Sequence, residues 1–534
     1  MKRPYKIALI VLGILFAVFA ALFIGADVAV SRLVYREVNQ ALAALPGCEA
    51  SCGPVRVRLF SGTAEVEDLR FAYHGEPVHK KDTTGPGIEV RVGQVAVGRV
   101  FYSLLLRRQV LVSDVHITDP QLELWLDDKH PESCFPKLED QGLAKAGEVL
   151  RSAEVQQLHV TDAVLRLHSL RTRLDAAVDS CSLTLYSLAY DSVFSYCDSV
   201  YHLSVAHASV TMPDGRMRID TRSLMQTDQG PLTLGATRIA HTMPRRRLGD
   251  MVKEPVTWMD MRLDSVSTSP FNPLRKALAQ DYTIERVNAV VGQMDIFRDT
   301  RYKPKHPFPM PQTELCRIPV TFRVGQAQAK IQHINIELAS TDNNCGKLHL
   351  GHISAMVQNI TNRRNATMRI NGSCPLESGF AKAEMSMTMN TDCDFSATLH
   401  AHGVDASMLN PFLRPLVGIT LDMHIDTLDT RYTGNSVKAN GRYRMLYHGL
   451  EIKVHRDDDI PYKIVTRNAG TINTLANSLL TKSNPTIVDY APRAYKAEWK
   501  RDEWQPFPLY LFGPCIDGTV KTLLPGLNVH MQTR

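Results

Sequence analysis

The chain has 534 residues, of which 44% are hydrophobic and 22% charged, and a formal net charge of +6. This composition supports a buried core and excludes a disordered tether. The small net charge, without a dense Lys/Arg tract, gives nucleic-acid binding little support, and the length predicts one to three domains.

The N-terminus predicts a membrane anchor. Lys2, Arg3 and Lys6 precede the uncharged run 7–26, and a helix of that length spans ~30 Å, the hydrocarbon thickness of a bilayer. Positive charges before the run favour a cytoplasmic N-terminus. A cleaved signal peptide is the alternative, but its apolar region is normally only ~7–15 residues long. We expect a retained single-pass anchor, with the rest of the chain on the far side of the membrane.

After the anchor, the hydrophobic period changes from that of a helix to that of strands. Val30, Val34 and Val38 recur at four-residue spacing and predict a helix over 30–45. From residue 55 to about residue 455, apolar and polar residues alternate in many short segments. This pattern predicts antiparallel strands with one apolar face and one hydrated face.

An internal repeat lies in the first third of the chain. The segment 114–124 (DVHITDPQLEL) recurs at 157–167 (QLHVTDAVLRL). We predict that each copy is a β-hairpin whose turn is the Thr-Asp pair at 118–119 or 161–162. The apolar residues before and after each turn would then share one face of the sheet.

The sequence contains none of the common catalytic motifs, such as HExxH, G-x-S-x-G, a P-loop or a dinucleotide-binding glycine motif. We therefore predict no enzymatic activity, no cofactor and no metal site. His116 and His159 occupy equivalent positions of the repeat, but solvent-facing histidines are commoner than metal ligands on strands. His349 and His352 are three residues apart on a predicted strand, so we expect them on opposite faces.

The ten cysteines are scattered along the chain. Cys48 with Cys52, and Cys181 with Cys197, are possible disulfides in an oxidising compartment, and free thiols are an equal alternative.

The amount of amphipathic strand needs an explanation. A closed sandwich would hide the apolar faces, whereas an open curved sheet would expose them along a groove and would require a ligand. Acyl chains suit such a groove beside a membrane anchor. The candidate groove residues are the apolar positions of the repeat: Val115, Ile117, Leu122, Leu124, Leu158, Val160, Leu165 and Leu167.

Four parts of the sequence carry a resemblance to a known family. They are the anchor with 30–45; the segments 61–69, 92–98 and 104–112 leading into 115–124; the segment 296–324, with its Pro-rich loop before a strand; and Met408 to Pro411 with Gly418 and the following strands. In these parts the chain resembles the AsmA-like family of bacterial envelope proteins, in its Bacteroidetes-like variety.

The resemblance implies a mainly β fold, in which an N-terminal transmembrane helix is followed by an elongated, curved antiparallel sheet of the repeating β-groove type with a few short helices. It implies the following division: 1–29, cytoplasmic tip and anchor; 30–298, N-terminal AsmA-like β region; 299–315, Pro-rich loop or junction; 316–455, C-terminal AsmA-like β region; 456–534, C-terminal helix and tail.

The resemblance also implies a function. Such a chain would be a non-enzymatic, single-pass inner-membrane protein with a periplasmic body that binds or channels phospholipid and supports outer-membrane assembly or envelope maintenance. Its partners would be phospholipids, the inner membrane and other envelope proteins. The alternatives are an anchored scaffold whose closed β domains bind other envelope proteins, and a hydrolase with an unrecognised site.

Overall fold

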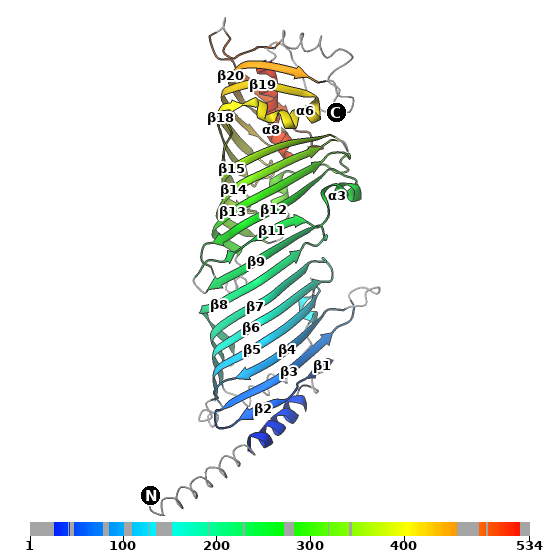
Figure 1. Ribbon diagram of the computed structural model, residues 1–534, viewed down its shortest axis with the longest axis vertical. Helices are drawn as coiled ribbons and strands as arrows, with labels where there is room; N and C mark the ends of the chain where they lie inside the picture. The colour runs from blue at the N-terminus through cyan, green and yellow to red at the C-terminus, as the bar shows by residue number, and fades with distance from the viewer. Residues whose placement is uncertain are drawn as a thin grey trace, which may run out of the picture. The chain divides into compact units, whose positions relative to one another are not determined.

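The computed structural model describes residues 26–40, 42, 47–77, 85–100, 109–127, 129–134, 152–191, 193–227, 230–271, 282–318, 320–340, 344–455, 480–486 and 490–523. The described residues are mainly in strands, which confirms the predicted β class (Figure 1). The chain divides into unit 1, residues 1–234, and unit 2, residues 235–534. Residues 7–25 of the predicted anchor lie outside the described ranges, and no helix within those ranges is long and apolar enough to cross a bilayer.

Unit 1 is a single sheet that follows the helical residues 26–40 (Figure 1). Its strands are β1 (Cys48–Ser51), β2 (Val55–Arg58), β3 (Thr63–His74), β4 (Gly87–Val97), β5 (Gln109–Leu126), β6 (Ser152–Ser169), β7 (Asp175–Asp191), β8 (Val193–Thr211), β9 (Met217–Thr227) and β10 (Thr233–Leu234), with the short helix η2 (Pro131–Cys134) after β5. β1 and β2 both pair with β3, and the later strands pair in chain order. These pairings are antiparallel except that of β5 with β6, which is parallel, so the prediction of a wholly antiparallel sheet was wrong at this position.

The repeat does not form two hairpins, and that prediction was wrong. Each copy belongs to one uninterrupted strand, β5 or β6, and the two copies lie side by side in parallel register, with Thr118 opposite Thr161. Parallel neighbours require a long crossover, and the residues between Leu126 and Ser152 provide it. The chain therefore passes straight through both Thr-Asp pairs.

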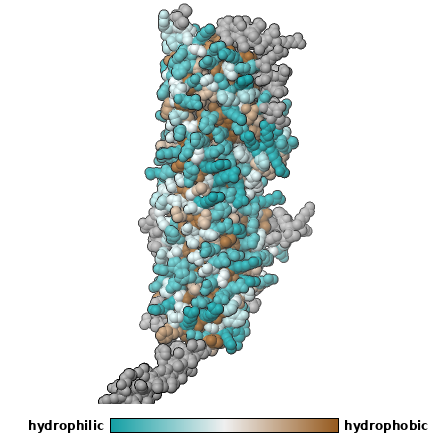
Figure 2. Space-filling model, viewed as in Figure 1, coloured by the Kyte–Doolittle hydropathy of each residue, from teal (hydrophilic) through white to brown (hydrophobic). Residues whose placement is uncertain are grey.

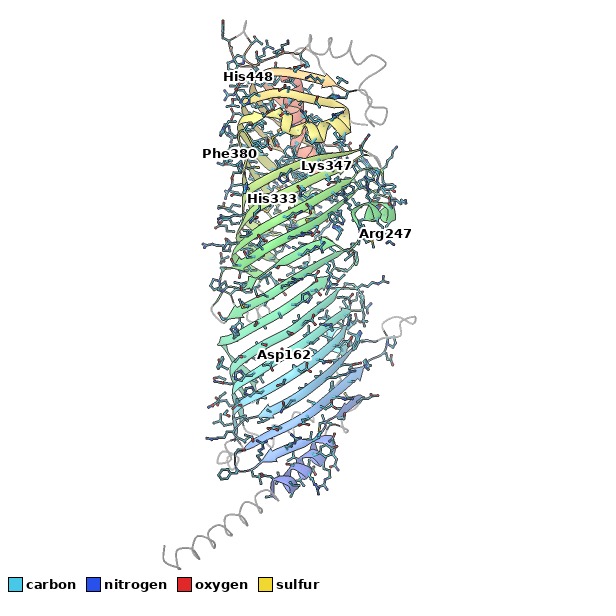
Figure 3. All side chains as sticks on the ribbon, viewed as in Figure 1. Asp162, Arg247, His333, Lys347, Phe380 and His448 are labelled. Carbon is cyan, nitrogen blue, oxygen red and sulfur yellow. The ribbon has the colours of Figure 1, made fainter. Side chains whose placement is uncertain are left out.

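The two aspartates instead adopt the left-handed conformation inside their strands, with φ of 53° at Asp119 and 55° at Asp162. Figure 3 shows Asp162 in the middle of its strand. The strand registers align these aspartates with left-handed residues of other strands: Asp68 of β3, Ser180 of β7 and Ser223 of β9. These left-handed residues form a row across the sheet, and the strands bend along it. Beyond the row, the residues that would otherwise face one side of the sheet face the other side.

The helix over 26–40 confirms the described part of the predicted helix 30–45. The helix lies along the edge strand β2. Its side chains accept hydrogen bonds from backbone N–H groups of β2 and of the residues on either side of this strand. Asp27 Oδ1 accepts from Leu59 N (2.9 Å), Ser31 Oγ from Val57 N (2.8 Å) and Asn39 Oδ1 from Cys52 N (3.0 Å). Acceptors four or eight residues apart fall along one side of a helix, so the helix covers an edge that could otherwise pair with another chain.

Unit 2 is also built mainly from strands. They are β11 (Thr237–His241), β12 (Val256–Thr268), β13 (Tyr282–Asp299), β14 (Phe322–Ala339), β15 (Cys345–Thr361), β16 (Thr367–Pro375), β17 (Phe380–Thr388), β18 (Phe395–Asp405), β19 (Ile419–Gly434), β20 (Lys438–Val454) and β21 (Ala494–Lys500). Its helices are α3 (Arg245–Val252), α5 (Pro311–Cys316), η3 (Ala406–Leu409), α6 (Asn410–Val417) and α8 (Phe507–Leu523). Consecutive strands from β11 to β21 pair antiparallel except for β13 with β14, which are parallel and whose crossover contains α5.

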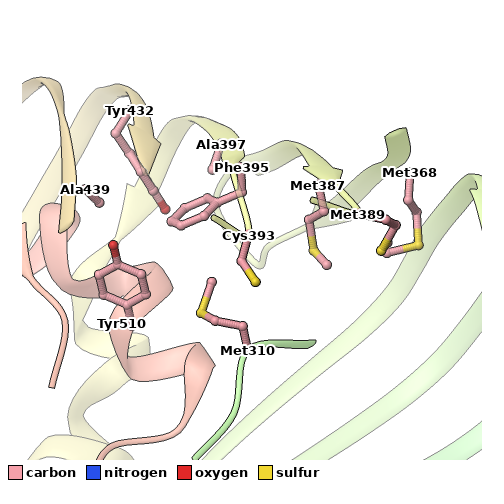
Figure 4. Close-up of a cluster of buried hydrophobic side chains, with 10 residues drawn as sticks. All are labelled: Met310, Met368, Met387, Met389, Cys393, Phe395, Ala397, Tyr432, Ala439 and Tyr510. Carbon is pink, nitrogen blue, oxygen red and sulfur yellow. The ribbon is translucent and has the colours of Figure 1, made fainter. Parts of the chain in front are cut away.

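The last helix covers the sheet of unit 2 with a packed core. α8 lies on β20 and β21, and its Tyr510 packs edge-on against Phe395 at 5.7 Å (Figure 4). Met310, from the Pro-rich segment, is only 2% exposed in the same cluster. Tyr443 and Tyr447 are each 1% exposed in a second cluster that includes Leu523 of α8. The apolar face of these strands is therefore closed.

Candidate functional site

The eight predicted groove residues lie opposite one another in pairs on the parallel strands β5 and β6. The pairs are Val115 with Leu158, Ile117 with Val160, Leu122 with Leu165, and Leu124 with Leu167. The left-handed residues Asp119 and Asp162 reverse the alternation between the first two pairs and the last two, so all four pairs share one face. The structure thus brings together all the residues that the sequence predicted.

The same face continues on both sides of these pairs. Each neighbouring strand places further apolar residues opposite them. One row across the sheet runs Phe71, Val90, Leu122, Leu165, Val178 and Ala208, and another runs Val66, Val95, Ile117, Val160, Leu183 and Leu203. Both rows cross six strands, from β3 to β8, and with ~4.8 Å between strands they span about 24 Å. The sequence indicated the apolar positions, but their alignment across strands depends on register.

This face is only partly covered within the part of unit 1 that the structure describes. All eight predicted residues are half-buried, and the fully buried Val92 and Val205 lie at the bend. The clusters of fully buried hydrophobic side chains that the described residues form both belong to unit 2. The same chain therefore contains one covered sheet face and one whose aliphatic side chains remain accessible.

The opposite face of unit 1 is polar. His168 lies 3.3 Å from Glu123, and Asp179 accepts hydrogen bonds from Arg166 and His207. These two bonds hold the pKa of Asp179 below its ordinary value. Figure 2 shows one side of the molecule, and hydrophilic side chains predominate there over the strands of unit 1. The sheet is therefore amphipathic, with charge confined to one side.

Histidines gather on the polar faces. His116 and His159 lie directly opposite each other, with stacked rings 4.7 Å apart. His349 and His352 both approach the ring of His333, at 5.6 and 6.2 Å, so the prediction that they face opposite sides was wrong. The left-handed φ of His352 (54°) reverses the alternation between them. Among the described side chains, no group of three or more His, Cys, Asp or Glu is arranged to hold a metal ion.

The possible disulfides are not formed, since Cys52 and Cys181 both carry free thiols. The half-buried Cys515 has its pKa raised to about 11, chiefly by desolvation, so this thiol stays protonated and unreactive at neutral pH.

Unit 2 also contains a cavity of about 1210 Å³. It lies beside the first half of β15, where pairing with β16 has not yet begun, and both aliphatic and polar side chains line it, including Leu348, Leu350 and Lys347. Figure 3 labels Lys347 and His333, which both line this cavity. No sequence pattern indicates this cavity, because its walls come from strands, a hairpin turn and η3 that are far apart in the chain.

Comparison of the chain with protein-family models, curated proteins and solved structures gave no match.

Proposed function

We propose that this chain is a membrane-anchored, non-enzymatic envelope protein whose unit 1 binds the acyl chains of phospholipid. The observation that carries the proposal is the apolar face of β3 to β8, most of whose aliphatic side chains are half-buried. Each methylene group that leaves water on this face contributes up to ~0.8 kcal/mol to binding.

The arrangement suits a carrier better than an enzyme. The candidate surface consists of aliphatic side chains, which bind by excluding water and supply neither a nucleophile nor a proton. The sequence resemblance to the AsmA-like family supports the same role, with the anchor at 7–26 in the inner membrane, the body in the periplasm, and lipid passage or outer-membrane assembly as the process served.

The test is lipid analysis of the purified full chain. The protein is extracted in mild detergent and washed until free lipid is removed, and the remaining lipid is quantified by mass spectrometry against protein. We expect about one or more phospholipids per chain. Folded protein without any acyl-chain lipid would overturn the proposal.

A scaffold that binds other envelope proteins is the second candidate, and the closed core beneath α8 in unit 2 favours it. In-cell cross-linking separates the two roles. Recovery of one stoichiometric partner together with lipid-free protein would favour the scaffold.

A further inference from the structure

The first strands of unit 1 expose hydrophobic side chains beside the N-terminal helix. Phe60, in the turn between β2 and β3, is 89% exposed, and Val28 and Leu33 of the helix are 49% and 54% exposed. Leu59 N donates to Asp27 Oδ1 at 2.9 Å, which holds this turn against the first turn of the helix. Phe60 and Val28 are each next in sequence to one of the bonded residues, so they lie at the same end of the unit.

This end, which we call the tip, is held firmly. The bonds from Val57 N to Ser31 Oγ and from Cys52 N to Asn39 Oδ1 fix the helix along the edge of the sheet over three turns. The hydrophobic side chains of the tip are therefore presented by a backbone that these bonds hold in place.

Basic residues lie next to the hydrophobic ones. Arg32 and Arg36 are exposed on the helix, one turn apart. Hydrophobic side chains that enter the acyl region, next to arginines that meet phosphate groups, are the combination by which a protein surface binds the interface of an anionic bilayer.

The chain itself indicates which partner covers the tip. The uncharged run 7–26 leads directly into the helix at Asp27, so the segment that precedes the described residues ends at this end of unit 1. If that run is in a bilayer, Val28 follows it almost at once in the sequence. Phe60 is brought to the same place by the hydrogen bond between its neighbour Leu59 and Asp27, so both side chains lie near the bilayer surface. The position of the tip therefore favours a membrane as its partner.

We propose that the tip is a membrane-contact site, in which Phe60, Val28 and Leu33 enter the bilayer interface while Arg32 and Arg36 bind lipid phosphate groups. This inference uses the anchoring part of the proposed function but not lipid binding by the β3 to β8 face. It places the beginning of the sheet at the membrane surface, where lipid could pass onto β3 without crossing water.

Photo-cross-linking in bilayers of phosphatidylethanolamine and phosphatidylglycerol tests the site with the full chain. Three aromatic residues are replaced singly by benzoylphenylalanine, a conservative change: Phe60 in the tip, Phe16 in the uncharged run, and the 83% exposed Tyr490 of unit 2 as the matched control. Samples are irradiated in the bilayer and again in detergent, and adducts are identified by mass spectrometry. We expect lipid adducts at positions 16 and 60 in the bilayer, at least ten times the yield at 490, with the adduct at 60 lost in detergent.

The outcomes separate this site from the rest of the proposed function. An adduct at 16 without one at 60 would overturn the tip and leave the anchor intact. An adduct at 60 that persists in detergent at equal yield would also overturn it, because the lipid would belong to the sheet face. An adduct at 60 without one at 16 would support the tip and reject the anchor.

Discussion

His116 and His159 lie directly opposite each other on the parallel strands β5 and β6, with their rings stacked at 4.7 Å. The two histidines occupy the same position of a sequence repeat, so their contact shows that the copies stand side by side in equal register. Every other matched pair of the repeat follows from this one, including Leu122 with Leu165 and Leu124 with Leu167. On the apolar face of unit 1, equivalent residues of the two copies of the repeat therefore lie next to each other.

The first prediction concerns this face. Leu124→Asp and Leu167→Asp place a charge where acyl chains would lie, and an unpaired charge against hydrocarbon is costly. We expect bound lipid to fall several-fold by mass spectrometry. Because both leucines are half-buried on an accessible face, the melting temperature should change by no more than ~2 °C, as for ordinary surface substitutions.

Gln121→Asp is the matched control, since Gln121 is exposed on the same strand. It should leave bound lipid unchanged. If the leucine variants instead lose several kcal/mol of stability, the face is a closed core and the lipid proposal is wrong.

The second prediction concerns the left-handed residues. Asp162 has a φ of 55°, a conformation that glycine adopts freely and a β-branched residue does not. Asp162→Val should lower the free energy of unfolding by ~1–2 kcal/mol, and Asp162→Gly should be nearly neutral. Urea denaturation measures both. Thr161→Val, at the neighbouring strand position, is the control, and equal losses for all three variants would contradict the explanation.

The third prediction concerns the covered edge of the sheet. Ser31→Ala and Asn39→Ala each remove an acceptor from a backbone N–H of the segment 52–59. Each substitution should lower the free energy of local unfolding of this edge by ~0.5–1.5 kcal/mol. Hydrogen exchange of Val57 and Cys52 amides should quicken, while β7 and β8 exchange as in the wild type. Unchanged exchange at 52–59 would mean that the helix does not protect this edge.

The fourth prediction concerns a buried ion pair in unit 2. The carboxylate of Asp299 is 0% exposed and accepts from Arg301 Nη2 at 2.7 Å and Nε at 2.9 Å. Arg301→Ala would leave this carboxylate buried without its main partner, at a cost of about 3–5 kcal/mol. Arg262→Ala removes only a long contact (3.9 Å) between an exposed guanidinium and Asp260, which keeps two hydrogen bonds from Arg238, and it should change the melting temperature by at most ~2 °C. Similar thermal stability of the two variants would argue against the pair's importance.

The fifth prediction concerns acid stability. Hydrogen bonds from Arg171 lower the pKa of Asp127 from 3.8 to about 2. A carboxyl with a depressed folded-state pKa stabilises the fold above its unfolded pKa, and that stability is lost as the pH falls from about 4 to about 2. The melting temperature of Asp127→Asn should therefore depend less on pH across this window than that of the wild type. If the melting temperatures of the two proteins fell equally with pH across this window, the stabilising role of the Asp127 carboxylate would be refuted.

The sequence alone was sufficient to predict that unit 1 consists of a helix followed by strands, although not how the strands of the repeat are joined. Alternating apolar residues predicted strands with one apolar face, because that period reflects burial of one side of each strand. The spacing of Val30, Val34 and Val38 predicted the helix, since they form its sheet-facing side. The eight candidate residues were identified by the same period.

Tertiary structure decided how these strands are joined. A Thr-Asp pair is compatible with a hairpin turn and with a left-handed residue inside a continuous strand, because aspartate tolerates positive φ in both. Only the neighbouring strand distinguishes the two, by supplying hydrogen bonds on both sides of Asp119 and Asp162. The same reason explains the error at His352, whose left-handed conformation has no local sequence signal.

Tertiary structure also decided which apolar faces are covered. The strands of unit 1 and of the C-terminal part of unit 2 follow the same alternating pattern, yet α8 packs onto β20 from more than fifty residues further along the chain. The alternating pattern indicates that one side of a strand is shielded from water. It does not indicate whether a helix of the same chain or a ligand shields it. That distinction depends on contacts between segments distant in the sequence.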